Sequence, residues 1–398
     1  MNLELSAHEL RFHELIRDFA AASIAPFAAS WEMERGFPRR VVRDSAARGF
    51  LGGTLPVSLG GQGWDATTYG LFTEAIAYHS VSLSGLFNVH TMVAQTILRW
   101  GSELQQRRLL PMLAQGEKVA AIAFTEPEAG SDLNGIRTRI EDCGAALRVS
   151  GNKKWITCGA LADIVLVFGR LDDRPAAVLI ETDNPGLCVK PLTEMLGFRA
   201  AHLAELELRD CEVPRENLIG RPGSALMYLA PYALEFGRVS VMWACLGILR
   251  ACLEICGEHV RKRKVSGRPL LDLGMIQTLL TDIGVQHHAA FLMALHGSRA
   301  RDCGDVQATD LILAAKYFAS QAAAQQSANA VQIMGALGCD ERLEIARHYR
   351  DAKTMEIIEG SSQIVQLLLS RTYAMQSARG CYGSSGEVAS AHRAGAQA

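Results

Sequence analysis

The 398-residue sequence lacks the signals of several common protein classes. Its ten cysteines form no CxxC pair and no clustered Cys/His spacing, so no zinc site is expected, and the thiols are interpreted as reduced. No GxGxxG follows an expected strand and no GxxxxGK(S/T) is present, which argues against Rossmann and P-loop nucleotide sites. The longest apolar run, Val239 to Leu249, is about 11 residues, whereas a membrane helix needs roughly 20. The start of the chain has no signal-peptide pattern, so we expect a cytoplasmic protein.

A strong excess of charge of one sign is also lacking, because the formal net charge is -2. General attraction to nucleic acid or to an anionic membrane is therefore not expected. The histidines, including His90 and the pair His287 and His288, lack ligand partners at metal spacing, and we interpret them as structural. What the chain does contain is 49% hydrophobic residues, enough for a large core and two or three domains.

The hydrophobic pattern divides the chain into four parts and predicts an α+β fold. Residues 1–118 show helical periodicity, residues 119–222 show short β-branched runs between Gly, Asp and Pro turns, and residues 223–375 return to long helical patterns. Residues 376–398 are rich in Ser, Gly and Ala and predict a disordered tail. The expected strands contain 147–149, 164–168, 177–180 and 204–208. The expected bundle helices are 228–264, 272–302, 306–336 and 341–375, the last broken at Gly360.

One acid occupies the break in the last helical pattern. Glu359 follows two isoleucines and precedes Gly360, a natural residue for leaving a helix, while Ser361 or Ser362 can cap the next helix. An acid at a helix C-terminus opposes the macrodipole, so stability alone does not select Glu359. Two interpretations remain at this point, a solvated acid in a loop and a buried base.

Five ordered motifs resemble the acyl-CoA dehydrogenase family. The motifs are TEPEAGSD from Thr125, GNKKWITCGALAD from Gly151, a stretch containing Arg263, QIMGALGC from Gln332, and RDAKTMEIIEGS from Arg350, in the family's order over about 370 residues. The resemblance implies the acyl-CoA dehydrogenase fold, with an N-terminal helical domain, a β-barrel-like central domain and a C-terminal four-helix bundle. It also implies one FAD per subunit between the last two domains, and a homodimer or homotetramer.

The resemblance assigns roles to individual positions. Glu359 would be the catalytic base, with Arg238 and Gly360 at the substrate, and no metal is implied. The implied FAD-binding residues are Phe124, Thr125, Gly130, Ser131, Trp155, Ile156, Thr157, Arg263, Gln332, Gly335, Ser361 and Gln363. In this family the positions of Arg263 and Gln332 reach the FAD of the neighbouring subunit. The alternative for Arg263 is one more charge in the basic run from Arg261 to Lys264. The chain departs from the family's usual residues at Cys158, Ser266, Ala336 and Cys339.

Some family branches place the base just before an arginine of the first long C-terminal helix. Here that position is Gly237, before Arg238, so Glu359 has no internal rival. Its carboxylate, with an ordinary pKa of about 4.3, would remove a proton beside a thioester carbonyl while hydride leaves the β carbon for the flavin. Desolvation should raise the pKa of such a base.

Three stretches resemble the branch of polyketide gene clusters that acts on glycerate-derived three-carbon units bound to an acyl carrier protein. The stretches begin at Gly197, Gly237 and Ala352. The product that this resemblance implies is a more oxidised, malonyl-like unit, toward a hydroxymalonyl- or methoxymalonyl-type extender unit. Basic residues could also dock an acidic carrier by electrostatic steering, or simply form a solvated helix face. The residues concerned are Arg261, Lys262, Lys264 and Arg268.

Other functions stay open at this stage. A short-chain acyl-CoA dehydrogenase that makes a 2,3-enoyl-CoA would use the same residues, and a flavin monooxygenase on the same fold would need oxygen. A flavin-free structural protein would be colourless when purified. The sequence does not identify the electron acceptor.

Overall fold

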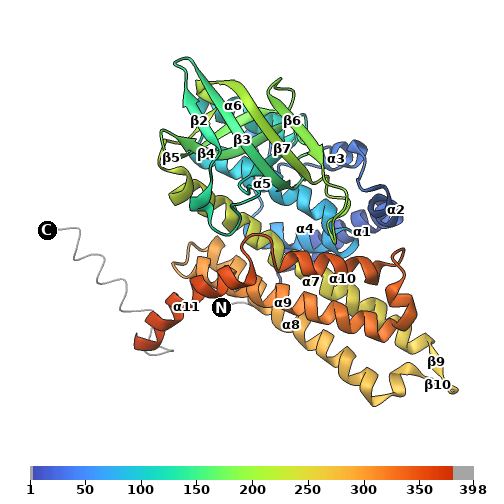
Figure 1. The fold of residues 1–398 in the computed structure, drawn as a ribbon. Coiled ribbons are helices and arrows are strands. Elements are labelled where there is room, and N and C mark those ends of the chain that lie inside the picture. The colour runs from blue at the N-terminus through green and yellow to red at the C-terminus, as the bar shows by residue number, and fades with distance from the viewer. Residues whose placement is uncertain (1–2, 380–398) are drawn as a thin grey trace.

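A computed structural model describes residues 3–379 as two groups of helices and a β-sheet (Figure 1). Helices α4 and α5 lie between the sheet and the long C-terminal helices, because α5 packs on β1 and both pack on α7. Capping boxes at Ser6 and Ser102 begin α1 and α6. The N-terminal helices are α1 (Ala7–Ser23), α2 (Ala25–Glu34), α3 (Arg39–Ala46), α4 (Ala66–His79), α5 (Val81–Trp100) and α6 (Glu103–Ala114).

Eight strands form the main sheet, in the order β6-β7-β3-β2-β4-β5-β8, and β1 pairs in parallel with β4. The predicted strand segments lie within β3, β4, β5 and β7, whereas the shorter strands were not predicted from the sequence. The bounds are β1 (Ala120–Ala123), β2 (Arg139–Asp142), β3 (Ala146–Ile156), β4 (Ile164–Leu171), β5 (Arg174–Glu181), β6 (Leu187–Pro191), β7 (Ala204–Pro214) and β8 (Leu218–Ile219).

Long helices form the C-terminal part, and a small hairpin of β9 (Lys264–Val265) and β10 (Arg268–Pro269) joins α7 to α8. By length and composition, one segment of the described residues, Ala225–Lys262, could cross a membrane, but 78% of its most apolar window is buried in the protein, as in a core helix. The helices are α7 (Ala230–Lys262), α8 (Gly274–Asp302), α9 (Ala308–Met334), α10 (Glu344–Met355) and α11 (Ser362–Arg379).

The α+β fold class predicted from the sequence is confirmed. The disordered tail predicted from residue 376 starts too early, because α11 continues through Arg379 and includes the first four residues of that predicted tail. The remainder of that predicted tail, residues 380–398, lies outside the described residues.

Candidate active site

Glu359 lies in the turn between α10 and α11, as the sequence predicted. Its backbone is left-handed, with φ of 55°, and Gly360 follows with φ of 96°. Two cations hold this turn: Arg238 Nε donates to the Glu359 carbonyl at 3.3 Å, and Lys316 Nζ donates to the Gly360 carbonyl at 2.7 Å. Ser361 Oγ accepts from the backbone of the next helix at 3.4 Å, so it caps α11 as expected. The strained turn is therefore fixed from both sides.

The carboxylate of Glu359 lies against the backbone of α7. A Cβ atom added to Gly237 would be only 2.3 Å from Glu359 Oε2 and 2.4 Å from its Cδ. Oε1 accepts a hydrogen bond from Asn88 Nδ2 at 3.2 Å, while Oε2 is buried and has no hydrogen-bond partner among the described residues. Only glycine at position 237 leaves room for the carboxylate in this position.

Burial raises the pKa of the Glu359 carboxyl. The hydrogen bond from Asn88 and the charges of Arg238 and Lys316 act in the opposite direction but do not cancel the effect of burial. Burial also lowers the pKa of Lys316 to about 8, although Glu359 opposes that shift. The carboxylate therefore binds a proton more strongly than an exposed glutamate does, which suits a base.

Helix α5 brings the end of β3 close to Glu359. A Cβ atom added to Gly85 would be 3.4 Å from Thr157 Cγ2, and Asn88, one helical turn further along α5, reaches Glu359. Three residues of helix rise only about 4.5 Å. The chain thus brings Thr157 and Glu359, which were predicted from separate motifs, to the two ends of one short stretch of α5.

The end of β3 and the loop after β1 fit a flat, polar cofactor such as FAD. Trp155 is 46% exposed and is held in a left-handed conformation, while Ile156 beside it is buried. Gly130 is open, since its nearest neighbour would be a methyl group 3.9 Å from an added Cβ atom. Three hydroxyl groups lie in this region, those of Thr125, Ser131 and Thr157. None of the three has a side-chain hydrogen bond within residues 3–379, so each is available to a cofactor as a donor and an acceptor.

A buried ion pair fixes the loop after β1. Lys153 is fully buried, and its Nζ donates to the Phe124 carbonyl at 3.0 Å and to Glu126 Oε1 at 2.8 Å. Burial lowers the pKa of Lys153 to about 8, although Glu126 opposes the shift. The ring of Phe124 is packed 4.2 Å from that of Phe168. Phe124 therefore faces the sheet interior, while Thr125 is half-buried beside it.

Three predicted FAD-binding residues lie far from Glu359 in the same subunit. Arg263 ends α7, about 37 Å from Arg238 by helical rise, and Gln332 and Gly335 lie at the corresponding end of α9. The two helix ends are adjacent, because Cys256 Sγ approaches the Ala330 carbonyl at 3.8 Å. All three are exposed, and Figure 1 shows their end of the bundle, marked by β9 and β10, far from the α10–α11 junction.

The basic residues considered for carrier docking lie at that same distant end. Arg261 and Lys262 end α7, while Lys264 and Arg268 belong to the β9–β10 hairpin. Docking there would therefore not bring a carrier close to Glu359 of the same subunit. Gln363, also predicted to contact FAD, is exposed on the first turn of α11.

Sequence reasoning missed Asn88 and Lys316. Both carry detectable signals: Asn88 interrupts the apolar helix α5, and Lys316 is the one charge in the run from Leu311 to Ser320. Both side chains are buried, at 5% and 0% exposure. A buried polar residue in an apolar helix is informative because it needs a partner.

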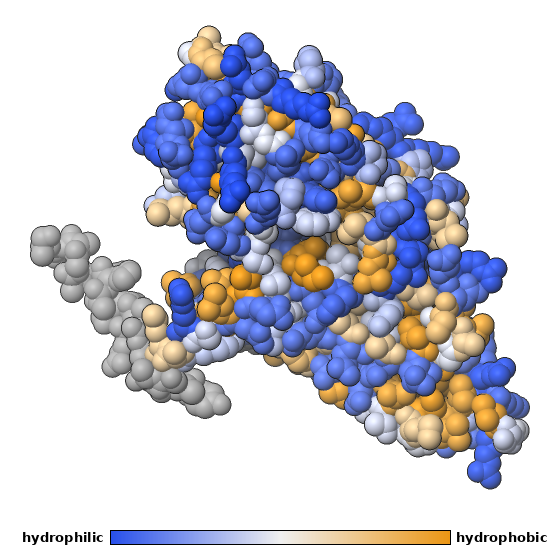
Figure 2. Space-filling model, viewed as in Figure 1, coloured by the Kyte–Doolittle hydropathy of each residue, from blue (hydrophilic) through white to orange (hydrophobic). Residues whose placement is uncertain are grey.

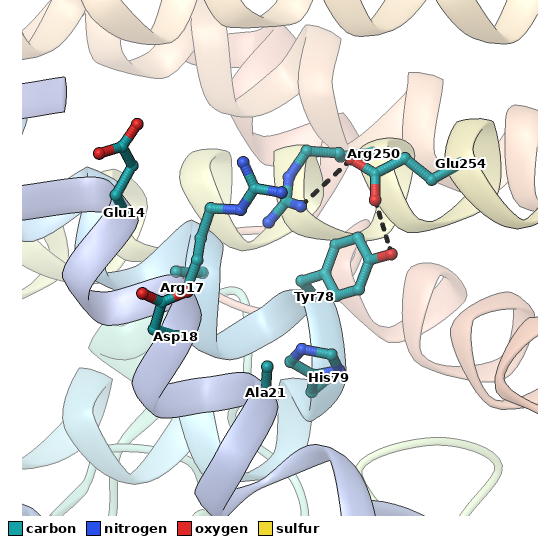
Figure 3. Close-up of a pocket in the computed structure, with 9 residues that line it drawn as sticks. Glu14, Arg17, Asp18, Ala21, Tyr78, His79, Arg250 and Glu254 are labelled. Atoms are coloured by element: carbon teal, nitrogen blue, oxygen red, sulfur yellow. Dashed lines mark hydrogen bonds and ion pairs between the residues drawn. The ribbon is translucent and has the colours of Figure 1, made fainter. Parts of the chain in front are cut away.

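The pocket in Figure 3 belongs to a different part of the molecule. It has a volume of about 350 Å³ and is lined mainly by polar side chains of α1, α4 and α7. Arg250, which lines the pocket, donates to Glu74 at 2.5 Å, and Glu74 also contacts His13 at 2.6 Å. Burial alone would raise the pKa of Glu74, but His13 and Arg250 hold it at about 2. This network joins three helices, and none of the residues that hold the Glu359 turn lines the pocket.

Over the described range, no group of three or more His, Cys, Asp or Glu side chains is arranged to hold a metal ion. His90 is buried, and its two ring nitrogens contact the Leu113 carbonyl and the Ala120 amide, both at 3.1 Å. These contacts confirm the structural role predicted for His90.

Comparisons with known proteins match almost the whole chain. Profiles of the acyl-CoA dehydrogenase N-terminal, middle and C-terminal domains match residues 6–117, 121–211 and 227–374. Mitochondrial isobutyryl-CoA dehydrogenase of Dictyostelium discoideum is 31% identical over 372 residues, which cover 92% of this chain and 89% of that protein.

Two solved structures are similar over their full length. FkbI, described as acting in biosynthesis of the methoxymalonyl extender unit of the Fk520 polyketide, has 32% identity and a TM-score of 0.84, covering 91% of this chain and 99% of FkbI. The prolyl acyl carrier protein oxidase AnaB has 25% identity and a TM-score of 0.88, covering 93% of this chain and 100% of AnaB.

Proposed function

Because this chain belongs to the acyl-CoA dehydrogenase family, and is therefore an FAD-dependent oxidoreductase acting on acyl thioesters, we propose that Glu359 is its catalytic base. The observation that carries the proposal is the enclosed carboxylate, with Oε2 buried against Gly237 and free of any described partner. A general base needs a free lone pair and a pKa close to the working pH, and burial moves the pKa of Glu359 in that direction.

FAD, when bound, supplies the two-electron acceptor for a hydride from the β carbon of the acyl group. Glu359 receives the proton of the α C–H bond, and the electron pair of that bond forms the new carbon–carbon double bond. If the acyl unit is an aldehyde hydrate, Glu359 instead receives a hydroxyl proton, and the O–H electron pair forms the carbonyl as the β hydride leaves. Arg238 and Lys316 keep the turn in place during either reaction through the carbonyls of Glu359 and Gly360.

The acyl unit in our proposal is glycerate-derived, has three carbons and is bound to an acyl carrier protein. The local similarity of residues 237–252 and 352–362 to the polyketide branch supports it. So do FkbI and AnaB, whose descriptions mention a methoxymalonyl extender unit and a prolyl carrier protein. Oxidation of the hydrated aldehyde of that unit would give a hydroxymalonyl-type unit, a step toward a methoxymalonyl-type extender unit. A short-chain acyl-CoA dehydrogenase is the second candidate, favoured by the similarity to isobutyryl-CoA dehydrogenase.

We further propose a homo-oligomer in which Arg263 and Gln332 contact the FAD of the neighbouring subunit. Their separation from Glu359 supports this, because a single flavin cannot extend along some 37 Å of helix. Figure 2 shows hydrophobic residues on the surface at this end of the bundle. Val265, Leu271 and Leu337, which belong to it, are 47%, 36% and 50% exposed. A single-subunit mass in solution would contradict this proposal.

We also propose a cytoplasmic location. The nine free cysteines among the described residues support it, because disulfides are rare in the cytoplasm.

Purified protein with bound FAD provides the test of function. Glyceryl-derived units on a carrier protein should bleach the flavin faster than the same units on CoA, and butyryl-CoA should bleach it least. Glu359→Gln should retain FAD and lose about 10²- to 10⁴-fold in bleaching rate, the usual contribution of a general base. Full activity of Glu359→Gln would exclude Glu359 as the base. Bleaching by butyryl-CoA alone would favour the short-chain dehydrogenase.

A further inference from the structure

Only one of the two polar atoms of the Asn88 side-chain amide has a hydrogen-bond partner among the described residues. Asn88 is 5% exposed, and its Nδ2 donates to Glu359 Oε1 at 3.2 Å. Its Oδ1 is buried and accepts no hydrogen bond from any residue that the structure describes. A buried acceptor needs a donor, and a molecule bound next to Glu359 can supply one to Oδ1.

Asn88 belongs to a polar stripe on an otherwise apolar helix. The stripe consists of Ser84, Asn88, Thr91 and Gln95, whose spacing of four, three and four residues places them on one face of α5. All four are at most 5% exposed. Gln95 is satisfied, since its Nε2 donates to the carbonyl and hydroxyl of Thr54, both at 2.9 Å.

A buried tyrosine continues this polar surface towards the base. Burial raises the pKa of Tyr69 to about 12, although hydrogen bonds with Ser240 and Thr91 oppose it, and the charge of Glu359 adds to the rise. Tyr69 therefore stays a neutral hydrogen-bonding group close to Glu359. A pocket for an alkyl chain would present methyl and methylene groups here, because an alkyl group leaves buried polar atoms unpaired.

We infer that Asn88 is a specificity-determining residue whose Oδ1 accepts a hydrogen bond from a hydroxyl group of the acyl unit. The inference rests on the proposed function, and it narrows the substrate to hydroxylated short acyl thioesters. An alkyl chain and a thioester carbonyl have no N–H or O–H, so neither supplies the missing donor. The same amide binds the base through Nδ2, so Asn88 places the substrate hydroxyl directly beside Glu359.

The experiment compares two matched thioesters on the FAD-loaded enzyme: glyceryl-pantetheine and propionyl-pantetheine, which lacks the hydroxyls. The rate constant of flavin bleaching in a single turnover is measured for each. The wild type should prefer the glyceryl thioester by at least about 100-fold, because a site built to bind a hydroxyl rejects the analogue without it. Asn88→Leu should reduce this ratio by about 10- to 100-fold, the effect of one buried hydrogen bond.

The ratio of the two rate constants separates recognition of the substrate hydroxyl by Asn88 from the effect of Asn88 on the position of Glu359. Asn88→Leu also removes the N–H that holds Glu359, but that loss slows both thioesters alike and cancels in the ratio. Asn88→Asp keeps the size and the acceptor oxygens, so it should retain the preference for the glyceryl unit while slowing both reactions through repulsion of Glu359. Thr96→Val is the matched control, since Thr96 is also buried on α5 but donates to the Met92 carbonyl within the helix.

Each other outcome contradicts the inference. An unchanged ratio in Asn88→Leu, or a wild-type preference for the propionyl thioester, overturns it while leaving the dehydrogenase function standing. Loss of FAD from Asn88→Leu, with FAD retained by Thr96→Val, would show that the flavin satisfies Oδ1. Bleaching by neither thioester or by any carrier-bound unit in the wild type would contradict the proposed function, and this inference with it.

Discussion

Substituting Gly237 by alanine should separate stability from activity. The new Cβ atom would be 2.3 Å from Glu359 Oε2, whereas ordinary contacts of a Cβ atom begin at 3.4 Å. The carboxylate must therefore move by about 1 Å, the difference between the two distances. It is the end of a flexible side chain, so the movement does not require the helix to shift.

The two expected effects have opposite signs. A misplacement of about 1 Å in a catalytic group typically costs about 100-fold in rate, so the bleaching rate should fall by about two orders of magnitude. Alanine is a better helix residue than glycine by about 1 kcal/mol, and position 237 is inside α7, so the free energy of unfolding should stay the same or rise. A variant that is at least as stable but much slower would identify a displaced base.

The assay pairs single-turnover flavin bleaching with thermal unfolding and FAD content. Gly257→Ala is the matched control, because Gly257 is also within α7 and its added Cβ atom would have its nearest neighbour, Arg261 Nη1, at 3.6 Å. The control should gain the same helix stability without loss of rate. Full activity in Gly237→Ala would refute the reasoning, since the carboxylate would then not need its place against Gly237 to act.

Two further predictions concern titration of buried acids. Because burial raises the pKa of Glu359 and only its ionised form is a base, the single-turnover rate should rise with pH through a midpoint above about 4.3, the ordinary value; a midpoint at or below that value would contradict the placement of the carboxylate. Burial likewise raises the pKa of Asp351 from 3.8 to about 7, with the nearby Glu32 adding to the rise. The folded state therefore favours neutral Asp351, and its contribution to stability is present below about pH 4 and is lost as pH rises through about 7. Asp351→Asn should raise Tm relative to the wild type more at about pH 8 than at about pH 5, and equal differences at the two pH values would contradict this reasoning.

Sequence patterns predicted the larger elements because their periodicity is local. The segments that became β3, β4, β5 and β7 carry runs of β-branched residues, and the four long helical patterns carry apolar residues at helical spacing. The short strands β1 and β2 have only four residues each, and β1 is largely alanine, so they form through pairing with β4 and not through local preference.

The residues of the candidate site also fall into two groups, those that sequence motifs selected and those that only the folded structure revealed. Sequence motifs selected Glu359 and the glycine at 237, because a turn between helices and a missing side chain are visible in the chain itself. They did not select Asn88 or Lys316, since the importance of a buried polar residue depends on which group it meets. Asn88 meets a residue 271 positions away, and Lys316 meets a carbonyl 44 positions away.

The sequence by itself determined the fold class, the order of helical and β segments, and the acid in the turn between α10 and α11. Only the tertiary structure decided that Gly237 is the surface on which this carboxylate rests, that Asn88 holds its other oxygen, and that Arg263 lies at the opposite end of α7. The physical reason is the distance along the chain over which each kind of interaction acts. Helix and strand preferences act over a few residues, whereas the environment of a buried charge is set by side chains that meet only when α5, α7 and the α10–α11 turn pack together.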